Sequence, residues 1–428
     1  MRVAKLASTH VIIGNSAAAV AAVEAIRHNG DQEPILLITD ENFPPYSRPL
    51  ISELLAGQIG SERMLYRAAD FYAQHQVETL LGVRAERVDP EKKLVKLADG
   101  RRVQYHDLLI ATGSGPIVPP IEGSELTGVF TFMKWQEALE LQAAAGRARR
   151  AIVIGGGLIG LKAAEALHHA GLEVAVVELA PRILPAAADE TASALMEKHL
   201  REAGLRIFTR NTVAKIEGEE GAVKRVRLQS GESLSTDMVV IAIGVRPNVK
   251  LVEGTSIQVR RGIVVDSHLR TTAPHVYAAG DVAEGYDLVM GENRLLPLWP
   301  VAYRQGMVAG ANIAGKQVEF EGYFAMNSIE LFGLPLISMG RLEALAEPGY
   351  EVLSRNDGRS YRKIILKDGI IVGAILLREI DRAGIITGLI REQTPVEEFK
   401  GELLKEDFGL LSLPKAWRKQ KLFSSRSG

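Results

Sequence analysis

The stretch Ala151–Glu178 decides the fold, and it reads AIVIGGGLIGLKAAEALHHAGLEVAVVE. Its apolar run at 152–154 predicts a strand, 161–169 predicts a helix, and 174–177 predicts a second strand. Between the first strand and the helix, residues 155–160 match the pattern G-x-G-x-x-G. The stretch therefore predicts a strand-helix-strand unit that binds a dinucleotide. A purely structural glycine turn is the alternative, because such turns join many strands to helices.

The three glycines of this motif have different physical tasks. Gly155 permits a tight turn, Gly157 lets a pyrophosphate approach the backbone, and Gly160 lets the helix pack closely on the strand. The pyrophosphate would lie at the helix N-terminus, where free N–H groups and the helix dipole favour an anion. Glu178 ends the second strand, where an acid accepts hydrogen bonds from a ribose 2′-OH. Because this acid repels a 2′-phosphate, we expect NADH rather than NADPH.

The composition of the 428-residue chain is that of an ordinary soluble enzyme. It is 46% hydrophobic and 24% charged, and its net charge of −1 indicates no nucleic-acid partner. At about 150 residues per domain, the length predicts two or three domains. The chain has no cysteine, which excludes disulfides, cysteine-bound iron–sulfur clusters and thiol redox chemistry within it. The apolar runs are shorter than the roughly 20 residues of a membrane helix, so we expect a cytoplasmic protein without a membrane partner. We predict no metal site.

A degraded copy of the motif opens the chain. Residues 11–19 read VIIGNSAAA and predict a strand, a turn and a helix. Gly14 keeps the tight turn, while Ser16 stands where the second glycine would be. Serine is small, so the backbone stays accessible to a second dinucleotide. Asp40 ends the next predicted strand and is the expected ribose acid, with Glu41 as the alternative.

Two small-residue turns and two crossing segments complete the expected fold. LLIATG (108–113) and VYAAGD (276–281) each predict a buried strand ending in a turn. The proline-rich segment 116–120 predicts the first crossing between domains, and GVRPN (244–248) predicts the return crossing. From about Glu319 the pattern becomes β-rich, with a hairpin signal at Asp368-Gly369. We predict an α/β protein with two Rossmann-like dinucleotide-binding domains, the second inserted in the first, and a C-terminal α+β domain. The predicted limits are 1–117 with 247–318, 118–246, and 319–428.

With these motifs in this order, nearly the whole chain resembles the FAD-dependent pyridine nucleotide-disulfide oxidoreductase superfamily. In that superfamily the first loop holds the FAD pyrophosphate and the second holds NAD(P)H. The aspartate matching Asp281 bonds the ribityl or phosphate region of FAD, and the Ala-Thr-Gly turn lies near the flavin. The resemblance implies FAD and NADH as cofactors. The implied FAD contacts are Gly14, Ser16, Ala17, Asp40, Arg48, Val83, Ala111, Thr112, Gly113 and Asp281. The implied NADH contacts are Gly155, Gly157, Ile159, Gly160, Glu178 and Gly244.

The loop that ends before Leu55 distinguishes branches of this superfamily. Disulfide reductases and NADH peroxidases carry a redox cysteine there, whereas this chain has proline and serine. The stretch PYSRPLIS (45–52) resembles instead the thiol-free ferredoxin and rubredoxin reductases. The stretch AGIITGLI (383–390) is similar to NADH-linked subunits of larger oxidoreductases, including the phenylglyoxylate dehydrogenase type.

One departure from these relatives concerns two charges. Ferredoxin reductases of this kind carry a lysine after the proline-rich loop and a glutamate just past the second glycine motif, both near flavin N5. This chain has Glu53 and Lys162 at those places, so the signs are exchanged. We predict a catalytic ion pair between them, within about 4 Å beside the isoalloxazine, because a lone charge is costly at low dielectric. Two separate surface charges are the alternative.

These implications converge on an electron-transfer flavoprotein. We expect a hydride to pass from NADH to FAD and electrons to leave for an external acceptor, such as a ferredoxin, a rubredoxin or an iron–sulfur subunit. One alternative is the NADH-handling subunit of a larger 2-oxoacid or aldehyde oxidoreductase complex that passes electrons to NAD+. Others are a redox-sensing binding protein with negligible turnover and an NADH oxidase. The C-terminal domain is a candidate homodimer interface.

Overall fold

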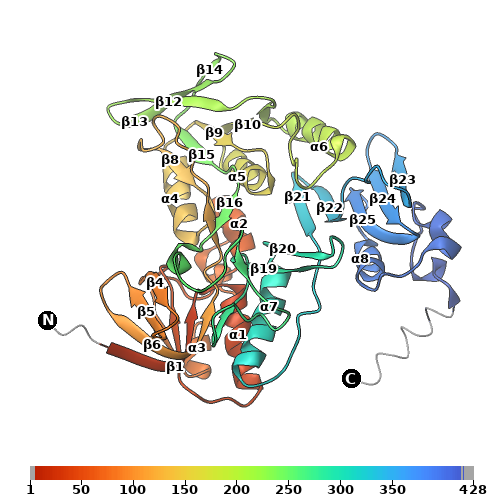
Figure 1. The fold of residues 1–428 in the computed structure, drawn as a ribbon. Helices are drawn as coiled ribbons and strands as arrows, with labels where there is room; N and C mark the ends of the chain where they lie inside the picture. The colour runs from red at the N-terminus through yellow and green to blue at the C-terminus, as the bar shows by residue number, and fades with distance from the viewer. Residues whose placement is uncertain (1–4, 416–417, 419–428) are drawn as a thin grey trace.

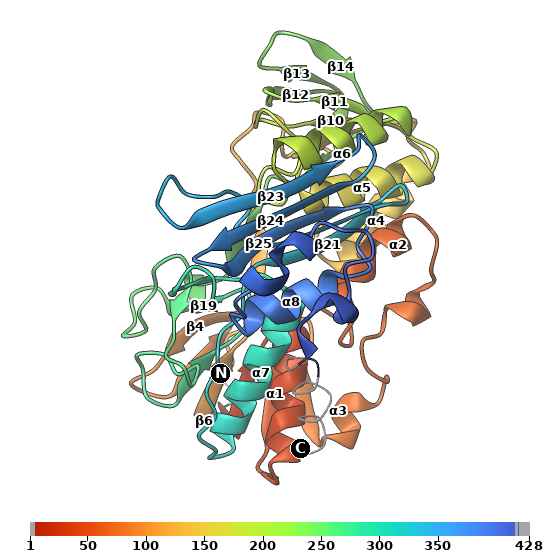
Figure 2. The ribbon, with the colours of Figure 1, turned by 90° about the vertical axis from the view of Figure 1, so that its right-hand side faces the viewer.

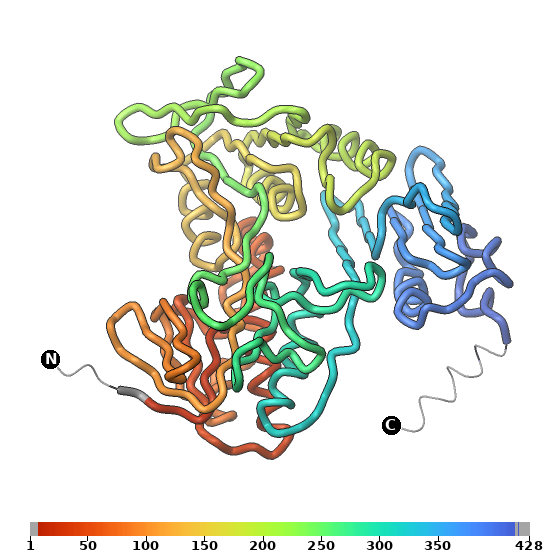
Figure 3. The backbone as a smooth tube through the Cα atoms, viewed as in Figure 1, coloured from red at the N-terminus to blue at the C-terminus, as the bar shows by residue number. Residues whose placement is uncertain are grey.

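The computed structural model describes residues 5–415 and residue 418, and the remaining end of the third predicted domain lies outside the described residues. Figure 1 shows three parts: a lower part in red, orange and teal, an upper part in yellow and light green, and a blue part beside them. The tube in Figure 3 passes from the lower part to the upper part and returns in green. Among the described residues, no helix is long and apolar enough to cross a bilayer.

The lower part is built on a seven-stranded sheet in the order β3-β2-β1-β6-β5-β4, with β18 also paired to β6. Strands β1, β2, β3, β6 and β18 run parallel, whereas β4 and β5 form an antiparallel extension. The runs of valine, isoleucine and leucine in β1, β2 and β6 are buried, as expected for a parallel sheet covered on both faces. The strands are β1 (Lys5–Ile13), β2 (Ile35–Ile38), β3 (Val77–Leu80), β4 (Ala85–Asp89), β5 (Leu94–Leu97), β6 (Arg102–Ile110) and β18 (Val276–Ala278).

Helices α1 (Ala17–His28) and α7 (Trp299–Ile313) pack side by side on this sheet. Two glycines of α7 make the approach close: a Cβ at Gly306 would overlap the carbonyl oxygen of Ala18, and one at Gly310 would overlap that of Ala22. The backbone of α1 therefore leaves no room for side chains on this face of α7.

The upper part contains a five-stranded parallel sheet in the order β11-β10-β9-β15-β8. A three-stranded antiparallel sheet, β12-β13-β14, lies at its end (Figure 1). The strands are β8 (Val129–Thr131), β9 (Arg150–Ile154), β10 (Glu173–Val177), β11 (Arg206–Phe208), β12 (Val213–Glu219), β13 (Ala222–Leu228), β14 (Ser233–Ser235) and β15 (Met238–Ile241). The helices are α4 (Trp135–Ala145), α5 (Leu158–His169) and α6 (Glu190–Glu202).

The two crossing segments pair with each other. Strand β7 (Ser114–Pro116) runs antiparallel to β16 (Val245–Pro247), and Asn248 exchanges hydrogen bonds with Thr112 through its carbonyl oxygen and side-chain amide. The chain therefore leaves the lower part and re-enters it at one place. This is the mixed α/β arrangement of two nucleotide-binding folds that the sequence predicted, and the exact domain limits stay a prediction.

The blue part is an antiparallel sheet in the order β21-β22-β25-β24-β23, with helix α8 (Ala383–Arg391) packed against β25. Figure 2 shows this sheet facing the viewer beside α5 and α6. The predicted hairpin at Asp368-Gly369 is confirmed, and both residues have positive φ (50° and 76°), as a two-residue turn between twisted strands requires. The strands are β21 (Met326–Leu331), β22 (Leu334–Gly340), β23 (Tyr350–Asn356), β24 (Tyr361–Lys367) and β25 (Ile370–Leu377).

Short elements fill the connections between these layers. They are the helices α2 (Ile51–Leu55) and α3 (Phe71–Gln74), the 3-10 turns Arg48–Leu50, Ser61–Met64, Lys250–Val252, Glu397–Glu402 and Leu410–Ser412, and the strands β17 (Ile263–Val264), β19 (Ala283–Asp287) and β20 (Glu292–Leu295). Helix α2 has a special position, because Leu54 and Leu55 share one hydrophobic core with Leu161 of α5 and with Leu331 and Leu377 of the C-terminal sheet. This core joins all three parts of the molecule.

We predict that Gly306→Ala lowers the free energy of unfolding by about 2 kcal/mol or more, because the added methyl group meets a backbone carbonyl that cannot rotate away. Gly384→Ala is the matched control: Gly384 is exposed in α8, a Cβ there meets nothing within 4 Å, and alanine favours the helix. Thermal and urea unfolding measure both variants. Equal stability of the two variants would contradict the close α1–α7 contact.

Candidate functional site

The turn from β1 into α1 lies directly against the end of β6. Gly14 has φ +128°, and a Cβ there would overlap the carbonyl oxygen of Ala111. The Gly14 N–H donates to the carbonyl of Ile38 at 2.8 Å, which ties the turn to β2 as well. Ser16 is the N-cap of α1 and makes no side-chain cap bond, so its hydroxyl does not occupy the helix N-terminus. The N–H groups of the first turn of α1 are therefore available to an anion.

The turn from β9 into α5 repeats this construction. Gly155 has φ +111°, and its Cβ would overlap the carbonyl oxygen of Ala242 at the end of β15. A Cβ at Gly160 would overlap the carbonyl of Gly155, whereas one at Gly157 would meet nothing within 4 Å. The conformations match the tasks inferred from the motif: a tight turn, close helix packing and an open approach to the helix N-terminus. The contacts of these glycines with NADH stay a prediction.

One cavity of about 1720 Å³ runs from the first turn, past the end of β6, to α5 and the β21–β22 hairpin. Twelve of the predicted site residues line it: Gly14, Ser16, Ala17, Asp40, Arg48, Glu53, Ala111, Thr112, Gly113, Ile159, Lys162 and Asp281. Six others do not line it: Val83, Gly155, Gly157, Gly160, Glu178 and Gly244. Three of these six, Gly155, Gly157 and Gly160, belong to the second glycine turn, and Glu178 bonds the N–H of Gly156 within it. The structure thus brings most predicted FAD contacts together with both predicted catalytic residues.

Asp281 follows β18, is half-buried and lines this cavity. Burial raises the pKa of Asp281, while the hydroxyl of Ser114, which donates to Oδ2 at 2.8 Å, and the charge of Arg48 partly oppose that rise. The preceding turn is fixed by Gln305 of α7, whose Oε1 accepts a hydrogen bond from the N–H of Gly280 at 2.7 Å. The sequence analysis missed Gln305, because nothing near it in the sequence marks it as a partner of this turn.

The two candidate ribose acids have different surroundings. Asp40 is 48% exposed at its side chain and forms an ion pair with Lys134 at 2.9 Å. Glu41 is 10% exposed, pairs with Arg48 at 2.5 Å and accepts a hydrogen bond from the phenol of Tyr46 at 2.7 Å. Both acids line the cavity. Since the carboxylate of Glu41 already has two protein partners, Asp40 is the more available of the two, and its ribose contact stays a prediction.

Glu178 is buried at the end of β10 and holds the second glycine turn in place. Its Oε2 accepts from the N–H of Gly156 at 2.6 Å, and its Oε1 accepts from the N–H of Ala180 at 2.7 Å. An ionised carboxylate has about four acceptor sites, so two remain for a ribose. The predicted NADH contact and this structural bond can therefore coexist.

The predicted ion pair between Glu53 and Lys162 is wrong. Lys162 Nζ instead lies 2.6 Å from Oε2 of Glu165, three residues further along α5, and among the described residues no ion pair joins it to Glu53. Glu53 accepts a hydrogen bond from the hydroxyl of Ser52 at 2.8 Å. The physical reason is helical spacing, because residues i and i+3 are neighbours on a helix surface.

Glu165 also connects α5 to the C-terminal sheet. Its Oε1 accepts from the N–H of Phe332 in the β21–β22 turn at 2.6 Å, and Lys162 Nζ lies 3.4 Å from the carbonyl oxygen of Glu330. Glu53, Lys162 and Glu165 all line the cavity. The sequence analysis missed Glu165, although its i+3 spacing from Lys162 was a usable signal.

Two nucleotide-binding folds, with the first glycine turn and helix α5 of the second fold lining one cavity, indicate an oxidoreductase that binds two nucleotides, and known proteins agree. The family model "Pyridine nucleotide-disulphide oxidoreductase" matches residues 8–306, and the model "Rubredoxin NAD+ reductase C-terminal domain" matches residues 326–394. The chain therefore belongs to the pyridine nucleotide-disulphide oxidoreductase family. Members of this family bind FAD and NADH, so the predicted class, fold and cofactors are confirmed.

Several relatives cover most of the chain. It is 30% identical over 416 residues to NADH-dependent phenylglyoxylate dehydrogenase subunit epsilon from Aromatoleum evansii, covering 96% of this chain and 98% of that protein. It is 31% identical to nitrite reductase [NAD(P)H] from Bacillus subtilis over 91% of this chain, but it spans only 48% of that longer relative. The crystal structure of a ferredoxin reductase from Rhodopseudomonas palustris is similar with a TM-score of 0.79 and 27% identity, covering 87% of this chain and 91% of that one.

The residues of the cavity fit an FAD molecule. The volume of the cavity exceeds the roughly 300–1,000 Å³ of ordinary small-molecule sites, as an extended dinucleotide requires. The N-terminus of α1 supplies donors for a pyrophosphate at one end. Next to it, at the end of β6, Gly113 has φ +63° and a Cβ there would meet nothing within 4 Å, which leaves room beside the turn. Asp281 and Arg48 add polar groups to the lining of the cavity.

We predict that Asp281→Ala lowers the FAD content of the purified protein at least about 10-fold, because it removes the half-buried acceptor that lines the cavity and leaves the Ser114 hydroxyl unpaired. Absorbance at the flavin band relative to the protein band gives the content. Glu253→Ala, which removes an exposed acid of the same part of the chain, serves as the control. Full flavin content in Asp281→Ala would contradict the assignment of Asp281.

Proposed function

We propose that this protein is an NADH-dependent flavoprotein oxidoreductase that passes electrons from NADH, through FAD, to an external acceptor such as a rubredoxin, a ferredoxin or an iron–sulfur subunit. The observation that supports the proposal is the continuous cavity, which is lined both by the first glycine turn at Gly14 and by Ile159 and Lys162, the residues that we expect to face the nicotinamide. The match of residues 326–394 to the rubredoxin NAD+ reductase C-terminal domain supports the kind of acceptor.

The chemistry is divided between cofactor and protein. FAD, when bound, accepts a hydride and releases electrons one at a time. The protein holds and orients: the turns at Gly14 and Ala111–Gly113 frame the first nucleotide, and α5 presents Ile159 and Lys162 to the second. Because the chain contains no cysteine, the electrons leave without a thiol of this chain.

Lys162 is the residue best placed to orient a nicotinamide ring. Its ammonium group is held by Glu165, and Glu165 is itself fixed by the N–H of Phe332, so the position of the charge is set by two elements rather than one. A preorganised cation near the flavin would interact favourably with the negative charge that the flavin gains when it accepts a hydride. Glu165 acts through Lys162 and is a positioning residue.

We predict that Lys162→Gln slows anaerobic reduction of the bound flavin by NADH about 10-fold or more, because removing a preorganised charge typically costs that much. Stopped-flow absorbance at the flavin band measures the rate. Lys198→Gln on α6 is the control, since that lysine is 70% exposed at its side chain and pairs only weakly, at 3.9 Å. The role of Lys162 is rejected when both variants are reduced at the wild-type rate.

We predict a strong preference for NADH over NADPH that depends on Glu178. Glu178→Gln keeps the size of the side chain and one acceptor for the Gly156 N–H but removes the negative charge. We expect the ratio of kcat/KM for NADH to that for NADPH to fall about 10-fold or more, because a 2′-phosphate is no longer repelled. Glu173→Gln, at the exposed start of the same strand, should leave the ratio unchanged. A wild-type preference for NADPH would refute this role.

A second candidate function is the NADH-handling subunit of a larger oxidoreductase complex, in which electrons flow from iron–sulfur subunits to NAD+. The match to phenylglyoxylate dehydrogenase subunit epsilon favours it, since that match covers both chains almost completely. Isolation of the native protein distinguishes the two. Iron–sulfur subunits that stay bound through size exclusion favour the complex, whereas a lone flavoprotein that reduces added rubredoxin or ferredoxin favours the first function.

Both candidate functions require that bound FAD exchanges electrons with NADH, and one experiment tests this requirement. The purified protein is titrated anaerobically with NADH while its flavin spectrum is recorded, and acceptors are then added. Bleaching with one equivalent of NADH and reoxidation by a rubredoxin or ferredoxin support the proposal. A protein that takes up no FAD overturns it. Rapid reduction followed by negligible reoxidation with every acceptor would instead support the redox-sensing alternative, and rapid aerobic NADH consumption an oxidase.

A further inference from the structure

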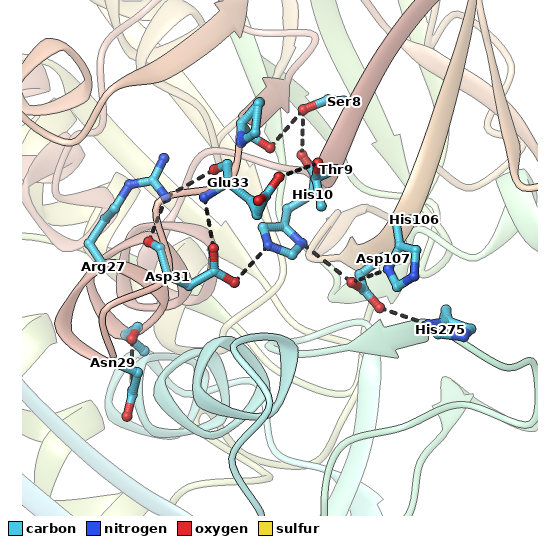
Figure 4. Close-up of polar contacts among 12 residues, drawn as sticks. Ser8, Thr9, His10, Arg27, Asn29, Asp31, Glu33, His106, Asp107 and His275 are labelled. Carbon is cyan, nitrogen blue, oxygen red and sulfur yellow. Dashed lines mark hydrogen bonds and ion pairs between the residues drawn. The ribbon is translucent and has the colours of Figure 1, made fainter.

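Two histidines and an aspartate meet on the lower sheet, away from the cavity (Figure 4). Nδ1 of His106 lies 2.7 Å from Oδ2 of Asp107, and Nδ1 of His275 lies 3.0 Å from Oδ1 of the same carboxylate. The ligand atoms of the three residues lie within 4.8 Å of one another. None of them lines the cavity. The cluster is therefore separate from the nucleotide sites.

The backbone fixes this meeting between distant segments. His106 and Asp107 belong to β6, and His275 directly precedes β18 with a left-handed φ of +63°. The N–H of Leu108 donates to the carbonyl of His275 at 2.9 Å, as the first bond between the two strands. Asp107 and His275 are thus neighbours in space although 168 residues separate them in the sequence.

A buried histidine lies close to Asp107. His10 of β1 is 3% exposed, with Nδ1 3.4 Å from Oδ2 of Asp107 and Nε2 3.0 Å from Oδ2 of Asp31. Figure 4 shows this line of groups from Asp31 through His10 to Asp107. The 3.4 Å approach of His10 to Asp107 is an ion-pair distance and not a hydrogen bond, because Nδ1 of His10 has no hydrogen-bond partner among the described residues.

We propose that His106, Asp107 and His275 bind a divalent transition-metal ion such as Zn²⁺, with water as the fourth ligand. Two imidazoles and one carboxylate form a common ligand set for Zn²⁺. With bonds of about 2.0–2.1 Å, a tetrahedral ion separates its ligand atoms by about 3.3 Å. The distance from His106 Nδ1 to Oδ2 of Asp107 would open by about 0.6 Å and that from His275 Nδ1 to Oδ1 by about 0.3 Å, and the carboxylate would turn to offer one oxygen to the ion. The side chains of His106 and His275 are 60% and 42% exposed, which lets them move and leaves space for water.

The ion acts as a clamp on the strand pair. It joins the start of the paired segment of β6 to the start of β18, and the opposite ends of these strands lead into the turns Ala111–Gly113 and Ala279–Asp281 that line the cavity. An ion that binds only the folded chain stabilises it by mass action. The competing explanation is a hydrogen-bonded cluster that binds no ion.

The test uses the full chain without a polyhistidine tag, freed of metal with EDTA and dialysed. Calorimetric titration with Zn²⁺ should give one ion per chain, and a saturating excess should raise Tm by about 3–8 °C. His106→Gln combined with His275→Asn should weaken binding about 100-fold or more and abolish the shift. Asparagine is chosen at 275 because it tolerates a left-handed backbone. His28→Ala, which removes an exposed histidine at the end of α1, should behave as the wild type.

Two further measurements keep the proposal falsifiable should the double variant misfold, which circular dichroism detects. His106→Gln alone should already weaken binding, and Co²⁺ added to the wild type should give the intense visible absorption of a four-coordinate ion. The proposal is overturned when the wild type takes up no ion, when the double variant takes up as much as the wild type, or when Co²⁺ shows only the weak spectrum of its hydrated form.

Discussion

The close contact of a glycine Cα with a backbone carbonyl, made twice, sets the geometry of this molecule. Gly14 lies against the carbonyl of Ala111, and Gly155 lies against that of Ala242. In each case the glycine turn follows one strand and the carbonyl ends its parallel neighbour, β1 with β6 and β9 with β15. No side chain fits between them, so each helix N-terminus is drawn down onto its sheet. Both dinucleotide sites depend on this one steric constraint.

The third part of the molecule is connected to the second through charge as well as through apolar packing. Glu165 receives the ammonium of Lys162 on one oxygen and the N–H of Phe332 on the other, so a β-turn of the C-terminal sheet fixes a cation in the cavity. Apolar burial alone is non-directional and would not set the position of that charge. The C-terminal sheet therefore contributes to the site although few of its side chains carry chemistry.

The sequence predicted what local patterns encode and missed what the fold brings together. The spacing of the glycines and the apolar runs predicted both nucleotide-binding units, and the pair Asp368-Gly369 predicted its hairpin. These signals could be used because each depends on residues that are close together in the sequence. The predicted Glu53–Lys162 ion pair was wrong because it was inferred from the positions of two charged residues in related reductases. Glu165, three residues after Lys162 on the same helix, offers a nearer carboxylate. Gln305 and the pairing of Asp107 with His275 had no local signal at all, and for the same reason no metal site was predicted.

The strand pair β6–β18 shows why such long-range groupings matter. Its carboxyl ends carry the turns with Ala111 and Asp281, where open α/β sheets bind their ligands. Asp107 and His275 directly precede the paired segments of β6 and β18, and neither lines the cavity. Since the two strands enter the sheet from segments far apart in the chain, their register depends on contacts at both ends. A link at the amino end limits how far the carboxyl end can shift, and so the shape of the cavity depends on residues that lie outside it.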